Sequence, residues 1–206
     1  MMSQMLGKMA FQSQIARSKA TISAFSMIRQ QMRYFSVKIG DKFPSAVVAI
    51  VKYDKDEGYS NEIVDINEYL EKKNVVLVGY PGCFTPTCQS QQLPQFLKAS
   101  DELKQQGADE ILALSVNDPF VVTAFAEYLG AKDRMNFIAD GNGELTMALG
   151  LGMDLTAVQL GPVRSTRFTM IVKDNNILEL NDEGGAQFTE KSCAATIKDQ
   201  LTPVRI

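Results

Sequence analysis

The sequence predicts an α/β fold in which a central mixed β-sheet is flanked by helices. Continuous runs rich in valine and leucine, at residues 75–78 and 111–116, are typical of strands that are buried on both faces. After each run, apolar residues recur with helical spacing. Late in the chain, two apolar runs flank the turn-forming residues 173–176, which predicts an antiparallel hairpin.

The elements before the first buried run are short. Residues 37–51 predict a strand or hairpin that covers one end of the core, with the strand pattern interrupted at Gly40 and Pro44. Residues 52–58 are mostly charged and typical of a turn. Residues 66–73 predict a short helix that leads into the first buried strand.

A helix is predicted to start soon after residues 75–78. The glycine and proline residues within 79–82 end the strand, Thr85 or Thr87 can cap the helix, and Pro86 suits its first turn. Cys88 therefore falls in the first helical turn, at the carboxyl end of a central strand. Open α/β sheets bind ligands at this end, and a helix start favours negative charge. Cys88 is thus a candidate thiolate.

The remaining elements alternate between helices and strands. Pro94 predicts a kink in the helix that starts near Cys88, and Gly107 ends that helix. Asn117 or Asp118 caps a second helix that runs to Gly130. A strand at 137–139, a helix to residue 149, a glycine-rich segment at 150–162, the hairpin at 168–180 and a last helix at 189–201 follow. This order is that of a thioredoxin-like sandwich in a single domain.

A reactive Cys88 would need a cation beside it. An unperturbed thiol has a pKa of ~8.5, so it is mostly protonated at neutral pH. A helix start contributes only ~0.3–1 kcal/mol in favour of a negative charge. One cation at ~4 Å offers ~4 kcal/mol at an effective dielectric constant of ~20, before desolvation is subtracted. Because the chain contains no histidine, this cation must be an arginine or a lysine.

Composition excludes several classes of function. The 206 residues are 45% hydrophobic, which is enough for one substantial core. Three cysteines are too few for a disulfide scaffold, and without histidine they cannot form a four-ligand zinc site. The absence of histidine also excludes Cys-His and Ser-His-Asp hydrolases. The chain contains neither a complete Gly-x-Gly-x-x-Gly nor a Walker loop, so no cofactor and no metal is predicted.

The charge is distributed unevenly along the chain. Residues 1–40 carry six bases and no acid, which leaves 15 bases against 24 acids in the remainder. Residues 1–35 are predicted to be a mitochondrial transit peptide, because they are basic and Ser-rich and can place apolar residues on one helical face. The sequence from Arg33 to Ser36 resembles a matrix-protease cleavage pattern; a basic arm that is never removed is the alternative. Residues 36–206 then form the domain, located in the mitochondrial matrix. Its acidic composition argues against a nucleic-acid partner, and the short apolar runs argue against a membrane span.

Three segments carry a resemblance to a known family. Pro81, Thr85 and Cys88 have the spacing of the peroxiredoxin active-site signature, Pro-x-x-x-Thr-x-x-Cys. Residues 115–120, Ser-Val-Asn-Asp-Pro-Phe, and 184–186, Gly-Gly-Ala, are similar to the peroxiredoxin-5, or type II, subfamily. The resemblance covers residues 37–201.

The resemblance implies a thiol peroxidase that acts on hydrogen peroxide and alkyl hydroperoxides. Cys88 would be the peroxidatic cysteine, which becomes a sulfenic acid. Thr85 would exchange hydrogen bonds with the peroxide and the thiolate, and Pro81 would shield the pocket from water. Arg167 would be the required cation, with Arg164 as a second candidate.

The way in which the sulfenic acid is resolved stays open. Cys193 lies close to the position of the resolving cysteine of animal relatives, although it also forms a helical stripe with Ile197 and Leu201 that is typical of a core-facing residue. Cys83 is a second candidate. Otherwise an external thiol acts, either glutathione with glutaredoxin or thioredoxin. The subfamily resemblance also implies a homodimer that packs around Phe84 and Phe120.

Two other functions compete with the peroxidase. A dithiol-disulfide oxidoreductase of the thioredoxin type is disfavoured because the chain has no Cys-x-x-Cys motif. A non-catalytic redox sensor or holdase would use Cys88 as a switch. The speed with which Cys88 reacts with hydrogen peroxide separates the sensor or holdase from the peroxidase.

Overall fold

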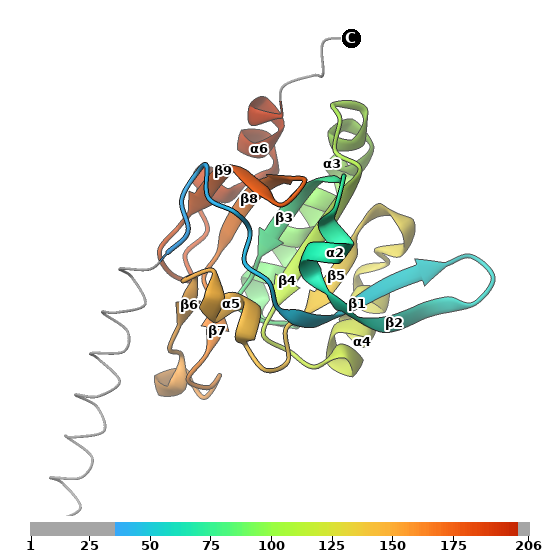
Figure 1. Cartoon of the computed structure of the whole chain (residues 1–206). Helices are drawn as coiled ribbons and strands as arrows, with labels where there is room; N and C mark the ends of the chain where they lie inside the picture. Colours follow the sequence, from blue (N-terminus) through green and yellow to red (C-terminus); the bar gives the residue numbers. More distant parts are fainter. Residues whose placement is uncertain (1–35, 202–206) are drawn as a thin grey trace, which may run out of the picture.

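The computed structural model describes residues 36–201, and a seven-stranded mixed sheet forms the centre of the fold (Figure 1). The strand order is β2-β1-β5-β4-β3-β8-β9. These strands are β1 (Val47–Asp54), β2 (Gly58–Asp65), β3 (Asn74–Gly79), β4 (Glu110–Ser115), β5 (Asn136–Ala139), β8 (Phe168–Lys173) and β9 (Asn176–Asp182). Strands β3, β4 and β5 are parallel and the outer strands are antiparallel, so the predicted mixed sheet is confirmed.

Helices cover both faces of the sheet. One face packs against α3 (Leu93–Gln105), α4 (Pro119–Leu129) and α6 (Ala194–Gln200), and the other against α2 (Ile66–Leu70) and α5 (Glu144–Ala148). Buried aromatic and aliphatic side chains fill the space between these layers. Figure 1 shows α6 beside α3 at the same end of the molecule.

Helix α4 follows its local sequence signals closely. The Asp118 carboxylate caps the helix by accepting from the N–H groups of Phe120 and Val121 at 3.0 Å each. Gly130 ends the helix in a left-handed conformation, with φ of 60°. The predicted cap and the predicted stop of this helix are both confirmed.

The first hairpin differs from the prediction. Residues 52–58 predict a turn, and a turn does form there, but it is confined to residues 55–57 because β1 continues to Asp54 and β2 starts at Gly58. Tyr53 and Tyr59 pair across the two strands, with ring centroids 5.1 Å apart. This cross-strand aromatic contact and the antiparallel ladder outweigh the turn preference of the charged residues. Figure 1 shows the hairpin extending from one side of the sheet.

The helix that carries Cys88 is irregular at its start. Residues 86–87 are helical, η1 (Cys88–Gln92) is a π-helical turn, and α3 follows directly. The Leu93 N–H donates to the Cys88 carbonyl, which is the i→i−5 bond of a π turn. The sequence predicts a kink at Pro94, whereas the irregularity in the structure is a π turn at residues 88–92, before that proline.

The predicted last helix is interrupted at Cys193. A 3₁₀ turn, η4 (Glu190–Ser192), precedes Cys193, whose backbone is extended at φ −84° and ψ 163°. Helix α6 begins only after it. Ile197 and Leu201 are buried as the stripe predicts, but Cys193 is half-buried because it lies outside the helix.

The glycine-rich segment after α5 contains two short strands that the sequence did not predict. Strands β6 (Gly152–Met153) and β7 (Arg164–Ser165) form a separate antiparallel pair, with η3 (Thr156–Val158) between them. A further 3₁₀ turn, η2 (Lys132–Arg134), precedes β5. Between residues 36 and 201, none of the helices combines the length and the apolar character that a membrane span needs. The predicted transit peptide, residues 1–35, lies outside the described residues.

Close packing joins the end of β3 to the start of β8. Gly79 pairs with Phe168, and a Cβ atom at residue 79 would lie 2.0 Å from Cε1 of the Phe168 ring. Only glycine fits at this position, because real Cβ atoms do not approach so closely. The contact sets the point from which the chain turns towards Cys88.

Candidate active site

Cys88 lies at the carboxyl end of β3, in a fully buried position. Its exposed fraction is 0%, and it packs with the side chains between the sheet and helices α3, α4 and α6. The first helical turn places it where the sequence predicts. A charge in this position is shielded from water, so electrostatic interactions with it are strong.

The Arg167 guanidinium contacts the sulfur of Cys88. Nη1 of Arg167 lies 3.5 Å from Cys88 Sγ, and Arg167 is only 2% exposed. Arg167 directly precedes β8, which runs antiparallel to β3. The end of β3 and the start of β8 therefore meet at one edge of the sheet, and this brings together two residues 79 positions apart.

Gln92, which is not among the residues predicted from the sequence, completes the contact between these residues. The residue is fully buried in the π turn. Its Oε1 accepts from Nη1 of Arg167, and its Nε2 donates to the Gly79 carbonyl at 3.1 Å. A signal for it exists in the sequence, because a helical residue four positions after Cys88 lies on the same face.

Backbone carbonyl groups hold the other side of the guanidinium. Nε of Arg167 lies 3.2 Å from the carbonyl oxygens of both Ala186 and Gln187, and Nη2 donates to the Ala186 carbonyl at 3.1 Å. The Phe188 ring lies 5.5 Å from the guanidinium carbon. The Gly-Gly-Ala segment of the sequence therefore belongs to the site.

Thr85 begins the helix that carries Cys88. Its carbonyl accepts from the Gln89 N–H at 3.1 Å, as an N-cap carbonyl does. Its hydroxyl donates to the Gly82 carbonyl at 2.9 Å rather than capping the helix through its side chain. The Oγ1 lone pairs remain able to accept a hydrogen bond from a bound ligand. Pro81 is buried in the loop that precedes Thr85.

Cys83 lies in a small polar cluster beside this loop. Its Sγ is 3.4 Å from the Tyr80 hydroxyl and 3.8 Å from the Ser115 hydroxyl. Burial raises the pKa of the Cys83 thiol, and the hydrogen bonds from Tyr80 and Ser115 only partly oppose this effect. Cys83 is therefore mostly protonated at neutral pH.

Cys193 lines a groove of about 560 Å³ together with residues that include Phe188 and Thr196. Its Sγ lies 3.4 Å from Thr196 Oγ1, and the Thr196 hydroxyl donates its proton to the Glu190 carbonyl at 2.6 Å. The Cys193 S–H is therefore the hydrogen-bond donor in its contact with Thr196. All three cysteines are free.

Arg164 does not contact Cys88. Its guanidinium donates to the carbonyl groups of Leu160 and Val116 at 2.6 and 2.9 Å, and to Asn117 Oδ1 at 3.2 Å. Asn117 Oδ1 also accepts from the Cys83 N–H at 3.1 Å. Arg164 thus connects the loops around the site, and Arg167 is the residue that lies beside the cysteine.

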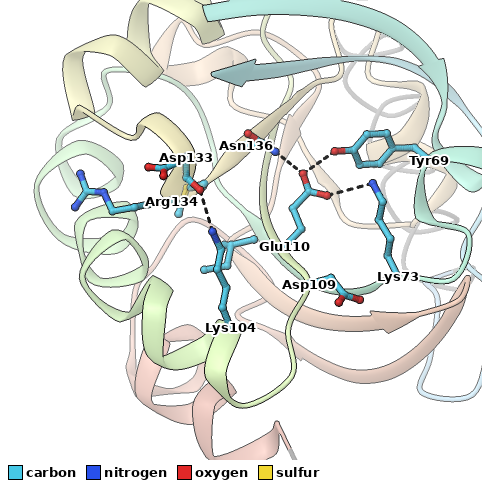
Figure 2. Close-up of a pocket in the computed structure, with 10 residues that line it drawn as sticks. Tyr69, Lys73, Lys104, Asp109, Glu110, Asp133, Arg134 and Asn136 are labelled. Atoms are coloured by element: carbon cyan, nitrogen blue, oxygen red, sulfur yellow. Dashed lines mark hydrogen bonds and ion pairs between the residues drawn. The ribbon is translucent and has the colours of Figure 1, made fainter. Parts of the chain in front are cut away.

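A separate pocket of about 350 Å³ lies at the opposite ends of the parallel strands, near the starts of β4 and β5 (Figure 2). Figure 2 shows the Glu110 carboxylate between Tyr69, Lys73 and Asn136. It accepts from the Tyr69 hydroxyl at 2.6 Å and from the Asn136 amide, and it pairs with Lys73 at 3.5 Å. These partners satisfy the hydrogen-bonding capacity of the carboxylate. No cysteine lines this pocket.

Comparisons with known proteins agree with this geometry. The family model described as Redoxin matches residues 38–197. Peroxiredoxin-2B of Arabidopsis thaliana is 37% identical over 162 residues, which cover 79% of this chain and 97% of the relative. Peroxiredoxin-2F, mitochondrial, of Arabidopsis thaliana is 38% identical over 148 residues, which cover 71% of this chain and 73% of the relative.

A solved structure gives the same result. Reduced Prx3 of Vibrio vulnificus in complex with hydrogen peroxide superposes with a TM-score of 0.69 at 35% identity, covering 80% of this chain and 99% of that one. The predicted thioredoxin-like fold is confirmed, and the peroxidase is favoured over the sensor or holdase. The Redoxin match and the relatives at this identity show that the chain belongs to the peroxiredoxin family and is a thiol-dependent peroxidase.

Proposed function

We propose that Cys88 is the peroxidatic cysteine and that Arg167 stabilises its negative charge and that of the transition state. The observation that carries this proposal is the 3.5 Å contact between Arg167 Nη1 and Cys88 Sγ in a buried site. No other thiol of residues 36–201 has a guanidinium within hydrogen-bonding distance. Preorganised donors of this kind act most strongly where water is excluded.

The reaction then runs in two stages. The Cys88 thiolate attacks the terminal oxygen of the peroxide, the O–O bond breaks, and the hydroxyl group is transferred to sulfur. The leaving oxygen takes up a proton and departs as water or an alcohol. Arg167 stabilises the charge as it moves from sulfur to the leaving oxygen. Thr85 Oγ1 accepts a hydrogen bond from the peroxide hydroxyl, and Pro81 shields the site from water.

An external thiol resolves the sulfenic acid in this proposal. It condenses with the Cys88 sulfenic acid to a mixed disulfide with release of water, and a second thiol then frees Cys88. The reductant is glutathione with glutaredoxin, or thioredoxin. Two observations support this route over Cys83 or Cys193. The pKa of Cys83 is raised by burial, and the Cys193 sulfur is engaged in a hydrogen bond with the Thr196 hydroxyl.

We assign the chain to the peroxiredoxin-5, or type II, subfamily, in its mitochondrial form. The Ser-Val-Asn-Asp-Pro-Phe and Gly-Gly-Ala segments support the subfamily. The basic, acid-free residues 1–35 support a transit peptide and a location in the matrix, with residues 36–206 as the mature domain. The mitochondrial name of one similar relative agrees with this location.

We also propose a homodimer that packs near the active-site loop. Phe84 is 45% exposed, Phe120 is 77% exposed and Tyr128 is 64% exposed. The Phe84 ring lies 5.6 Å from that of Tyr128 and 4.9 Å from the buried Phe125 ring. Phe120 lies at the start of α4, the helix that also carries Tyr128. Exposed aromatic residues are enriched at protein interfaces.

The first prediction concerns the rate of the peroxide step. Arg167→Ala should slow the reaction of Cys88 with hydrogen peroxide by about 10²–10³-fold, because one preorganised donor to the transition state is lost. Arg167→Lys should retain part of the rate, because it keeps the charge but not the fork of donors. Stopped-flow measurement of thiol loss gives both rates, with Cys88→Ser as the inactive control. An unchanged rate in Arg167→Ala would contradict the role of Arg167.

The second prediction concerns resolution. After one equivalent of hydrogen peroxide followed by one equivalent of glutathione, peptide mapping should find glutathione on Cys88. A Cys83→Ala/Cys193→Ala variant should then turn over with glutathione as fast as the native chain. Recovery of a disulfide that joins Cys88 to Cys193 or to Cys83 would show that the resolving thiol is internal.

The third prediction concerns assembly. Phe120→Glu should shift the protein from dimer to monomer, because it places a charge in the proposed apolar interface. Leu178→Glu is the matched control, since Leu178 is an exposed apolar residue on the edge strand β9. Sedimentation equilibrium measures the mass of each variant. Monomeric native protein, or a Phe120→Glu variant that stays dimeric, would exclude this interface.

The fourth prediction concerns residues 1–35. Protein recovered from mitochondria should start near Ser36, and N-terminal sequencing identifies that residue. A variant in which Arg17, Lys19 and Arg29 are replaced by glutamate should stay outside mitochondria, because transit peptides are basic and poor in acids. An uncleaved chain outside mitochondria in both cases would favour the basic-arm alternative.

A further inference from the structure

The loop of residues 183–192 surrounds the Arg167 guanidinium. The Glu183 N–H donates to the Arg167 carbonyl at 2.9 Å, and the Arg167 N–H donates to the Gly185 carbonyl at 2.8 Å. The carbonyl groups of Ala186 and Gln187 face Nε and Nη2. The direction of the guanidinium therefore depends on the backbone path of this loop.

The loop has little regular structure of its own. Strand β9 ends at Asp182, and the next element is the short 3₁₀ turn η4. Gly184 has a φ of 71°, a conformation that costs glycine little. A loop with so little regular structure needs side-chain contacts to keep its backbone in a single conformation.

The Glu183 side chain supplies these contacts by joining the two ends of the loop. Its Oε1 accepts from the N–H groups of Thr189 and Ser192 at 3.1 and 3.2 Å, and from their hydroxyl groups at 2.9 and 2.8 Å. Its Oε2 lies 2.9 Å from Thr189 Oγ1. The three residues that face Arg167, 185–187, thus lie inside a ring closed by one carboxylate.

We propose that Glu183 is a positioning residue for peroxide reduction, because its carboxylate fixes the loop whose carbonyl groups aim Arg167 at Cys88. This inference rests on the proposed role of Arg167. Glu183 acts through the backbone path of the loop and forms no ion pair with the guanidinium in the described structure.

The ionisation of Glu183 agrees with this arrangement. Burial raises the pKa of the Glu183 carboxyl, but hydrogen bonds from Ser192 and Thr189 outweigh burial and hold the pKa below its usual value. The carboxylate is therefore ionised at neutral pH and able to accept all of these bonds.

A double-mutant cycle tests the proposal. Glu183→Ala should slow the reaction of Cys88 with hydrogen peroxide by roughly 10- to 100-fold, as expected for a catalytic group displaced by about 1 Å. In an Arg167→Ala background, Glu183→Ala should have no further effect, since the group that it positions is absent. A purely structural role would instead lower the rate by the same factor in both backgrounds.

Two further variants separate geometry from charge and from folding. Glu183→Gln should retain most of the rate, because its amide oxygen can accept the bonds made to Oε1 and its NH₂ can donate to Thr189 Oγ1. Ser192→Ala removes one donor and should give a smaller loss than Glu183→Ala. Glu190→Ala is the matched control on the same loop, and its rate should equal that of the native protein.

The outcomes distinguish this inference from the proposed function. A native rate in Glu183→Ala, or additive losses in the cycle, would overturn the inference while leaving the role of Arg167 intact. If Glu183→Ala does not fold, a native rate in Ser192→Ala would overturn it. If Arg167→Ala itself reacts at the native rate, both the role of Arg167 and the role of Glu183 are wrong.

Discussion

The site depends on one buried contact, between the Arg167 guanidinium and the Cys88 sulfur. An isolated cation in a protein interior costs several kcal/mol, unless partners compensate for its lost hydration. Arg167 has these partners on both sides, in the Gln92 amide and in the carbonyl groups of Ala186 and Gln187. The guanidinium is therefore held on both sides before any substrate binds, and its direction is fixed by several parts of the chain.

Sheet topology explains why these parts meet. Cys88 follows a strand and Arg167 precedes one, so only antiparallel neighbours place both residues at the same edge. Strands β3 and β8 are such neighbours, and their pairing ends at Gly79 and Phe168. The absence of a side chain at Gly79 lets the Phe168 ring close over this point. The Gln92 amide donates to the Gly79 carbonyl and accepts from the Arg167 guanidinium, so it connects the end of β3 to the guanidinium.

Capping and helix-ending residues in the sequence predicted those helices whose ends are determined by neighbouring residues. Helix α4 follows from Asp118, Pro119 and Gly130, since capping and termination act within a few residues. The break at Cys193 was missed because Thr189 to Leu201 has helical spacing, and the contacts that divide it come from Glu183.

The candidate site shows the same division. Cys88 was placed from its position in a strand–turn–helix sequence, and Arg167 from the resemblance to peroxiredoxins. Gln92 and Glu183 carry polar side chains that in a sequence suggest a solvent-exposed surface. Their contacts depend on residues brought close by the tertiary fold, and only the folded chain identifies them.

The outer side of the active-site loop has a constraint of its own. Phe84 has a φ of 58°, an unfavourable conformation for a bulky residue that costs about 1–3 kcal/mol. Its ring packs edge-on against Phe125 and Tyr128, which compensates for that cost. The turn that leads to Thr85 is thus held from the surface by aromatic contacts, while the Cys88 end is held from the interior by Arg167. Since Phe84 lies only four positions before Cys88, the short segment between them is held at one end by aromatic packing and at the other by the Arg167 contact.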